Sequence, residues 1–535
     1  MTLSDHLPVL LVLTPLLGAP IVSLFRSISR PLATLLAAAT AAIAWGLVQQ
    51  TADGSELNYH LGGWAPPIGI EYEISMAAAW TVAVVSTLAF FSILAGCHNA
   101  AREVTEGREH LYYAAFLLCL AGLLGMATTG DAFNVFVFLE ISSLSTYTLV
   151  AMGKGRRSFT AAFNYLILGT IGGTFILLGI GLAFQATGSL NIDDIAARIQ
   201  DLRGSRTVLV AFGFLATGLS IKLAVFPLHQ WLPGAYAESP TAVGAFLAGT
   251  ATKVIYFQLI RVCVMLFGAS YVFEELHFGT LLRWLSVFGM FVGSLAAVYQ
   301  TSLKRLLAFS SIGQVGYLTL ALSLGSELGV RAGLLHLAAH GITKCALFLV
   351  TGAIVATTGS DRLSRLAGFG KRRPLIAFAF VVGGIGLIGV PGTAGFVSKW
   401  ALLRAAFESG HTIIAVLSLA SSMIAVVYVW RVVEVMYLKP SVETDSADGS
   451  RPWALMVPAS ILLAVSVGAG LYSAPATAYA SRAASTLWNR VPVAAELPEP
   501  RPVHHDDAHD AAAEHGAHES AAPEGQAGPE EGSTP

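Results

Sequence analysis

The chain has 535 residues, of which 55% are hydrophobic and only 12% are charged, with a formal net charge of −2 at pH 7. Soluble domains carry about 25% charged residues, so this composition excludes a soluble globular protein. Long apolar segments recur from about residue 7 to residue 480, and a membrane-spanning helix needs about 20 largely apolar residues. The sequence therefore predicts an all-α polytopic membrane protein.

About fourteen spanning helices are expected. The first apolar segment, residues 7–25, has no basic residue before it and no small-residue cleavage site after it, which indicates a first span and not a signal peptide. The predicted spans are 5–25, 31–50, 74–98, 110–128, 132–152, 160–187, 207–235, 239–267, 277–300, 303–324, 330–357, 374–408, 411–438 and 452–480.

Lys and Arg gather in alternate loops, such as residues 26–30, 154–157 and 362–373, whereas the long loop 51–73 contains acidic residues and no Lys or Arg. Short loops rich in Lys and Arg lie on the cytoplasmic side of a membrane. We therefore expect a multi-pass protein of the cell inner (plasma) membrane with both termini on the outer face.

The C-terminal segment, residues 491–535, is predicted to be a disordered acidic, His-rich tail. Its last 35 residues contain eight acids and five His among Ala, Gly and Pro, too polar a mixture to bury a core. Loose binding of a divalent metal is the alternative, and we assign the tail no catalytic role. The four Cys residues have no CxxC-like spacing, so we expect no metal or redox cofactor in this chain.

Charged residues in the middle of apolar spans indicate an ion path, because each costs about 2.5–3.5 kcal/mol to insert. Glu140 lies in such a span and needs either a proton or a cationic partner. Lys222 precedes Pro227, which should break its helix, and it is predicted to pair with Glu140. Lys253 lies in the next span between small residues and could pass a proton on.

The eleventh predicted span carries His336, His340 and Lys344. A spacing of four residues turns an α-helix by only about 40° beyond a full turn and rises about 6 Å, so the three side chains share one face. This column resembles a proton wire, since His titrates near neutral pH. Interpreted as a zinc-protease site, the His336 and His340 motif lacks the catalytic Glu and a third ligand.

Lys399 follows a second expected helix break at Pro391-Gly392. Interrupted helices in corresponding positions of two halves are typical of inverted-repeat transporters. The alternative for each Lys is a structural one, in which it reaches the membrane interface or neutralises an acid. Arg261 and Arg404 are expected to lie at the interface.

Two motifs resemble the antiporter-like subunit family: Gly130-Asp131-Ala132-Phe133-Asn134-Val135-Phe136-Val137-Phe138-Leu139-Glu140-Ile141-Ser142-Ser143 and Phe226-Pro227-Leu228-His229-Gln230-Trp231-Leu232-Pro233-Gly234-Ala235-Tyr236. The resemblance covers about residues 70–440. It implies fourteen helices with two inverted five-helix repeats and broken helices 7 and 12. It also implies proton-carrying roles for Glu140, Lys222, Lys253, His336, His340, Lys344 and Lys399.

The predicted organisation is helices 1–3 (1–109), a first repeat (110–270), a second repeat (271–440), helix 14 (441–490) and the tail. The two motifs are closer to those of the Mrp-type Na+ or K+/H+ antiporter D chain than to those of complex I subunits. The alternatives are a proton-pumping N- or M-type subunit of an NADH:quinone oxidoreductase or membrane-bound hydrogenase, and a non-transporting scaffold. Expected partners are other membrane subunits, lipid, protons and Na+ or K+, but no nucleic acid.

Overall fold

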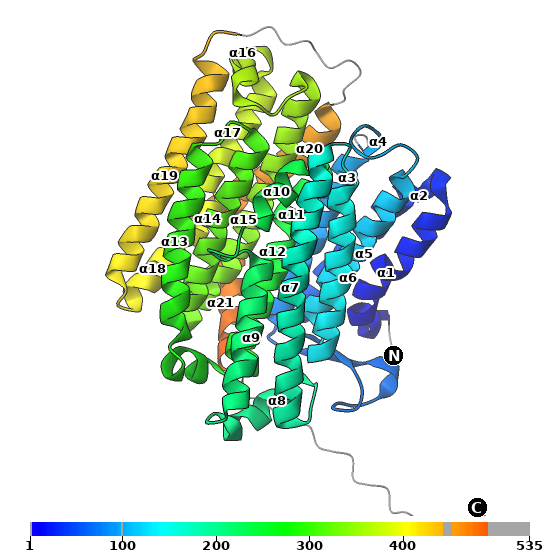
Figure 1. Cartoon of the computed structure of the whole chain (residues 1–535), viewed down its shortest axis with the longest axis vertical. Coiled ribbons are helices and arrows are strands. Elements are labelled where there is room, and N and C mark those ends of the chain that lie inside the picture. Colours follow the sequence, from blue (N-terminus) through cyan, green and yellow to red (C-terminus); the bar gives the residue numbers. More distant parts are fainter. Residues whose placement is uncertain (1–2, 98–99, 442–451, 491–535) are drawn as a thin grey trace, which may run out of the picture. The chain divides into compact units, whose positions relative to one another are not determined.

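The computed structural model describes residues 3–97, 100–441 and 452–490. Within these residues, thirteen helices are long and apolar enough to cross a membrane, and Figure 1 shows them packed side by side. The broken span at residues 374–408 adds a further crossing built from two shorter helices. The predicted all-α polytopic fold is therefore confirmed, while the tail predicted from residue 491 onward lies outside the described residues.

The first helices are α1 (Leu7–Leu24), α2 (Ser29–Gln50), α3 (Met76–Gly96) and the short α4 (Ala100–Glu103). Between α2 and α3, the acidic loop folds into an antiparallel hairpin of β1 (Leu57–His60) and β2 (Glu71–Ile74), in which Leu57 pairs with Ile74. The hairpin positions several carboxylates at one end of the bundle.

The next group comprises α5 (Glu109–Thr128), α6 (Ala132–Ala151), α7 (Arg156–Thr187), α8 (Ile192–Ile199), α9 (Arg206–Leu223), α10 (Trp231–Glu238), α11 (Thr241–Gly249) and α12 (Ala251–Ile260). The last group comprises α13 (Phe278–Val298), α14 (Leu303–Ser323), α15 (Glu327–Thr358), α16 (Phe369–Arg372), α17 (Pro374–Ile388), α18 (Ala394–Glu408), α19 (Thr412–Tyr437), α20 (Pro452–Leu471) and α21 (Ala474–Trp488). The long helix α15 runs through the interior and packs against α3, α11, α14, α17, α18, α20 and α21.

Both predicted helix breaks are present. Helix α9 ends at Leu223, and Ala224 then adopts a left-handed conformation with φ 62°. The carbonyl of Ile221, at the end of α9, accepts hydrogen bonds from the Ala224 backbone N–H at 3.1 Å and from the Trp231 indole at 2.9 Å. The second break separates α17 from α18, where Gly389 has φ 89°, a conformation that favours glycine. A third break, between α11 and α12 at Thr250, was not predicted.

The last predicted span, 452–480, was too long. Helix α20 ends at Leu471, and a separate helix, α21, begins at Ala474 with Pro475 in its first turn, where proline is tolerated. The buried residues of α21 recur three or four positions apart, as in an amphipathic helix that packs by one face. They are Tyr479, Ala480, Ala483, Ala484 and Leu487.

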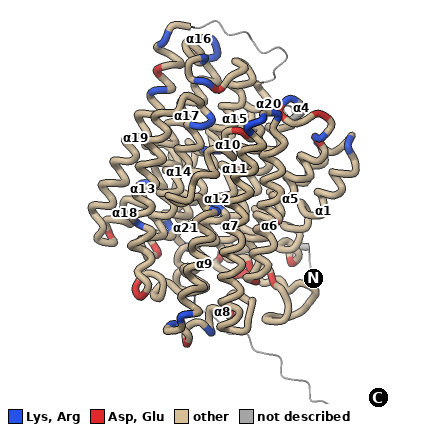
Figure 2. Tube along the Cα trace, in the orientation of Figure 1, with Lys and Arg blue, Asp and Glu red and all other residues tan. Residues whose placement is uncertain are grey.

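Charged residues mark the two ends of the bundle (Figure 2). Many Lys and Arg residues lie around α4, α16 and the first turn of α14, which we call the basic end. The hairpin lies at the opposite end, where the His6 imidazole contacts the Tyr59 hydroxyl at 3.1 Å. Arg490, the last described residue, also reaches the hairpin, at Glu56. Both ends of the described chain therefore lie on the side of the hairpin.

Candidate functional site

A partly exposed carboxylate and a buried amine meet where α6 passes the broken end of α9. The Lys222 amine lies 3.6 Å from Oε1 of Glu140. It donates a hydrogen bond of 2.6 Å to the Ser143 hydroxyl and lies 3.4 Å from the Tyr147 hydroxyl. The Lys222 side chain is almost completely buried. The structure thus brings together the pair that the sequence predicted, and adds two hydroxyl partners.

Glycines on α7 make room for this pair. A Cβ at Gly173 would overlap the Glu140 carboxylate, and a Cβ at Gly169 would overlap the Tyr147 hydroxyl. The two glycines are four residues apart and therefore lie on the same face of α7. The position of the Glu140 carboxylate is consequently set by α7 as well as by α6.

Lys253 lies in the first turn after the break at Thr250 and is fully buried. Its amine donates to the carbonyl oxygen of Ala248, in the last turn of α11, and to the Thr252 hydroxyl at 3.2 Å. The break provides this carbonyl, because helix ends leave backbone acceptors without intrahelical partners. The third helix break therefore serves the buried amine of Lys253.

Close packing of α11 on α15 brings Lys253 near the histidine column. A Cβ at Gly341 would lie 2.9 Å from the Gly249 carbonyl oxygen, so the two backbones approach closely. Gly249 is the last residue of α11, and Gly341 directly follows His340. Small residues thus connect the first group of charged residues to α15, as their pattern around Lys253 suggested.

His336 and His340 stack on one face of α15. Their ring centroids are 5.8 Å apart and the ring planes differ by 9°. His336 Nδ1 lies 3.0 Å from the Ser398 hydroxyl of α18. Within the described residues, neither ring nitrogen of His340 has a hydrogen-bond partner in the protein. Both rings are buried, which keeps the column away from the lipid-facing surface.

Lys344 lies one turn beyond His340, but its amine turns toward α14. It donates to the Leu307 carbonyl oxygen at 2.7 Å and to the Ser310 hydroxyl at 2.5 Å. The three side chains therefore share one face of α15, as predicted. The two outer residues of this column contact different neighbouring helices. His336 contacts α18 and Lys344 contacts α14.

Lys399 is held by the broken end of α17. Its amine donates to the carbonyl oxygens of Leu387 and Ile388 at 3.1 and 2.9 Å. It also lies 3.2 Å from the Ser422 hydroxyl and 4.5 Å from the centroid of the Tyr317 ring. These groups line a cavity of about 290 Å³ between α17, α18 and α19. No carboxylate lies within ion-pairing distance of Lys399 in the described residues.

Sequence reasoning missed the neutral partners of these amines. Ser143 and Tyr147 follow Glu140 by three and seven residues, so their helical spacing could have revealed them. Tyr317 and Ser422 could not have been found this way, because they lie on other helices, α14 and α19, than Lys399 does. Arg261, expected at the interface, is buried and lies 3.6 Å from Glu73.

Sequence and structure comparisons relate this chain to known proteins. The family model for NADH:quinone oxidoreductase/Mrp antiporter transmembrane proteins matches residues 129–425. The N subunit of the NADH-quinone oxidoreductase of Desulforudis audaxviator is 40% identical over 478 residues, covering 87% of this chain and 94% of that protein. The D chain of the Na+/H+ antiporter of Alkalihalophilus pseudofirmus is 29% identical over 428 residues, covering 80% and 85%.

Two solved structures are similar over most of the chain. The Mrp complex from Dietzia sp. contains a chain with a TM-score of 0.84 and 27% identity, with coverage of 91% of this chain and 98% of that one. The membrane-bound sulfane sulfur reductase, an archaeal respiratory complex, gives a TM-score of 0.83 and 30% identity, with coverage of 90% and 98%.

Proposed function

Because the chain belongs to the NADH:quinone oxidoreductase/Mrp antiporter transmembrane family, we propose that it is the proton-translocating subunit of a multi-subunit monovalent cation/proton antiporter of the Mrp D type. The observation that carries this proposal is the series of ionisable side chains from Glu140 to Lys399 in an otherwise apolar bundle. Such groups are costly at membrane depth and are typical of ion paths. The similarity to the Mrp complex over 91% of the chain supports the antiporter assignment.

In the proposed mechanism, the Glu140 and Lys222 pair is the switch of the first half. While the carboxylate is ionised, its charge stabilises the protonated amine 3.6 Å away. When Glu140 takes up a proton, the buried amine loses this counter-charge, and the neutral form of Lys222 becomes favoured. The released proton passes towards Lys253.

The second half of the path consists of α15 and the broken α17/α18 pair. A proton moves from Lys253 to His340, whose two ring nitrogens have no hydrogen-bond partner in the described residues. It then follows the stacked rings to His336 and reaches Lys399 beyond Ser398. Lys344, bound to α14, lies on a side branch towards Ser310. The segments 110–270 and 271–440 act in this proposal as two inverted repeats joined by α15.

A partner membrane protein of the same complex covers the outer face of α6 in this proposal. Glu140 lies on the side of α6 that also carries the exposed side chains Phe133, Val137 and Leu144, and about a quarter of its own side chain is exposed (28%). A carboxylate facing lipid would cost about 2.5–3.5 kcal/mol. The similar solved structures come from multi-subunit complexes, which supports such a neighbour.

The orientation that we propose places the basic end in the cytoplasm, because short loops rich in Lys and Arg remain on that side of the plasma membrane. Both chain termini then lie on the outer face. A cysteine introduced at Arg365, at the basic end, should react with a membrane-impermeant maleimide only in inverted vesicles. Labelling of this cysteine in intact cells would show that the basic end faces outward.

A second candidate function is that of a proton-pumping subunit in an NADH:quinone oxidoreductase. The 40% identity to an N subunit favours it. In that case, electron transfer in other subunits would drive the same buried series. The two candidates therefore differ in what supplies the driving force and not in the residues that carry the proton.

The test uses inverted membrane vesicles that contain the complete native complex and a pH-sensitive dye. An antiporter moves protons when Na+ or K+ is added without an electron donor, whereas a redox pump moves protons only when the donor is oxidised. In either case, Glu140→Gln and Lys222→Ala should abolish the flux at equal amounts of inserted protein, since each leaves its partner uncompensated. Full flux in both variants would refute the proton path, and donor-dependent flux alone would refute the antiporter assignment.

A further inference from the structure

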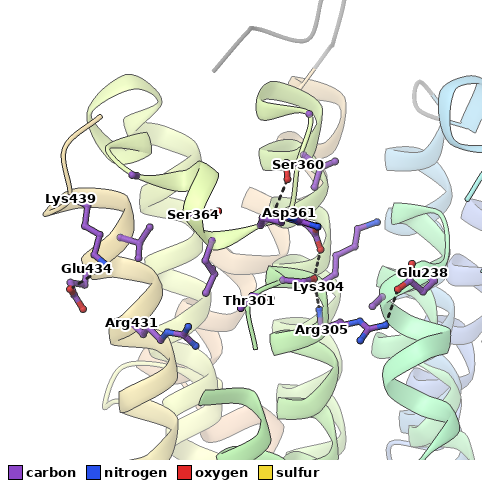
Figure 3. Close-up of a pocket in the computed structure, with 18 of the residues that line it drawn as sticks. Glu238, Thr301, Lys304, Arg305, Ser360, Asp361, Ser364, Arg431, Glu434 and Lys439 are labelled. Atoms are coloured by element: carbon purple, nitrogen blue, oxygen red, sulfur yellow. Dashed lines mark hydrogen bonds and ion pairs between the residues drawn. The ribbon is translucent and has the colours of Figure 1, made fainter. Parts of the chain in front are cut away.

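A large cavity at the basic end is separate from the buried proton path. It has a volume of about 1150 Å³ and is lined by the start of α14, the end of α10, residues 359–364 with Ala367, and the last turns of α19. Figure 3 shows Lys304 and Arg305 of α14 near the middle of this cavity, with Arg431 and Lys439 reaching it from α19. The cavity is large enough for a small-molecule ligand.

Positive charge predominates on the cavity wall. Three acidic side chains line it, Glu238, Asp361 and Glu434. Six basic side chains line it, Arg157, Lys304, Arg305, Arg362, Arg431 and Lys439. The cavity thus attracts anions, and it lies at an end of the bundle, where spanning helices terminate (Figure 2).

The acidic side chains are already engaged with neighbours. Glu238 pairs with Arg305 at 3.2 Å, and Glu434 lies 4.0 Å from Lys439. Asp361 accepts a hydrogen bond from the Ser302 hydroxyl. With two carboxylates paired to Arg305 and Lys439 (Figure 3), Asp361 is the one carboxylate of the described residues on the wall that faces the other four basic side chains, and positive charge remains in excess.

Those four are Arg157, Lys304, Arg362 and Arg431. Arg431 donates to the carbonyl oxygens of Val298 and Gln300, the latter at 2.9 Å, and Lys304 lies 3.5 Å from a backbone carbonyl. Within the described residues, none of the four has an acidic partner at ion-pairing distance. Four cations in one cavity repel one another unless an anion binds between them.

We propose that this cavity binds a phosphate-bearing anion, and that its source is the headgroup of an anionic phospholipid. Arg presents a planar fork of donors that matches phosphate oxygens, and Lys adds a point charge. Basic pockets between spanning helices are suited to lipid phosphates. One turn before the lining residues Arg431 and Glu434, α19 exposes Val427 and Trp430, so the cavity adjoins an exposed apolar strip on the same helix. Free phosphate shares the chemistry and is the alternative source.

The proposal goes beyond proton transport and can be tested by binding alone. The purified complex in a neutral detergent is titrated with phosphatidylglycerol, with phosphatidylcholine, or with inorganic phosphate at constant ionic strength. The thermal transition is recorded at each step, because a ligand that binds only the folded protein raises the transition temperature. The variant is Arg157→Gln/Arg362→Gln, since both side chains are exposed and neither has an ion-pair partner in the described residues.

A matched control is Arg365→Gln/Lys371→Gln. Both of these residues are exposed, lie at the same end of the bundle and do not line the cavity. The control and the variant therefore have the same net charge, and a general loss of surface charge affects them equally. The transition temperature without lipid reports whether either double variant is misfolded.

We expect a saturable stabilisation by phosphatidylglycerol that phosphatidylcholine does not reproduce. In the cavity variant, the phosphatidylglycerol concentration at half-maximal stabilisation should rise at least about tenfold, as expected from the loss of a charge-assisted hydrogen bond. The control should titrate like the wild type. Equal stabilisation by inorganic phosphate, lost in the same variant, would support the site and identify a soluble source. Equal midpoints of the lipid titration in the variant and the control would overturn the proposal. It would also be overturned if the wild type showed no response to lipid and the variant lost a neighbouring protein of the complex.

Discussion

Buried amines in this bundle are held by neutral oxygen atoms. Lys399 donates to two backbone carbonyls and lies beside the Ser422 hydroxyl, and Lys222 donates to the Ser143 hydroxyl next to its carboxylate partner. A hydroxyl can either accept a hydrogen bond or donate one, so it can serve an amine in its charged form and in its neutral form. Such surroundings suit an amine that gains and loses a proton.

Lys399 allows a sharp test of this titrating role. Lys399→Arg should reduce proton flux as severely as Lys399→Ala, because an arginine keeps its charge and is effectively never deprotonated in a protein. The measurement is proton flux in inverted vesicles across a pH series, normalised to inserted protein. If position 399 needed only a positive charge to pack against Tyr317, Arg could replace Lys there. Near-normal flux from Lys399→Arg would therefore show that Lys399 has a structural role only.

At the scale of elements, helix breaks and small residues decide where the charged side chains meet. Breaks after Leu223, at Thr250 and after Ile388 each place free backbone carbonyls beside a buried side chain. In α7, glycines leave space into which the Glu140 and Tyr147 side chains project. The geometry of the path therefore depends on backbone features as much as on the ionisable residues.

Gly173→Ala tests the role of α7. The added methyl group would overlap the Glu140 carboxylate and push it away from Lys222, and a displacement of about 1 Å in a reacting geometry can cost about 100-fold in rate. Gly181→Ala is the control on the same helix, since a Cβ there meets nothing within 4 Å. Proton flux should fall strongly in the first variant only, and similar flux in both would show that α7 does not set the carboxylate position.

Arg490, two residues beyond the end of α21, joins the chain to a group of carboxylates at the hairpin end. Arg490 contacts Asp193 of α8 at 2.7 Å and Glu56 at 3.2 Å, and it also pairs with the buried Glu73 of β2. Removing it would leave three carboxylates without their shared cation. Loss of one partner of a buried ion pair costs about 3–5 kcal/mol, so Arg490 should be important for the stability of this end.

Arg490→Gln should lower the thermal transition at about pH 7.5 and lower it less at about pH 5. Burial, with the nearby charge of Glu73, raises the pKa of Asp193 to about 6, although Arg490 acts in the opposite direction. Asp193 therefore takes up a proton more readily in the folded state than in the unfolded state. Acidification through pH 6 favours folding, because protonation of Asp193 removes its repulsion with Glu73. Arg482→Gln on the same helix is the control, because Arg482 is exposed and donates to a backbone carbonyl. A loss of stability independent of pH would contradict this account.

In the whole molecule, α15 joins the two halves. It packs against α3 and α11 from the N-terminal half of the chain and against α14, α17 and α18 from the C-terminal half. It carries His336, His340 and Lys344 near its centre. In the proposed path, a proton therefore crosses between the halves along one helix, without passing through a loop. The basic cavity and the hairpin end lie outside this path and serve binding and stability in our account.

Deletion of residues 501–535 should leave proton flux nearly unchanged. The segment contains eight acids and five His and almost no large apolar side chains, so it has little surface with which to dock on the bundle. The truncated chain should insert normally and be assayed in the same vesicles. Complete loss of flux at normal insertion would assign the tail a function.

Composition and hydropathy were sufficient to predict the membrane class, the approximate spans, and the breaks at Pro227 and Pro391. They also identified Glu140 and Lys222 as a pair, because a charge in an apolar span is conspicuous and a proline has a known effect on a helix. The break at Thr250 depends on packing with neighbouring helices, and no proline marks it, whereas Pro475 marks the start of α21 and our prediction did not use it. The carbonyl partners of Lys253 and Lys399 depend on where the nearby helix breaks occur. The burial of Arg261 and the basic cavity arise from contacts between segments far apart in the chain. Only the folded bundle brings those segments together, since the periodicity of one helix carries no information about its neighbours.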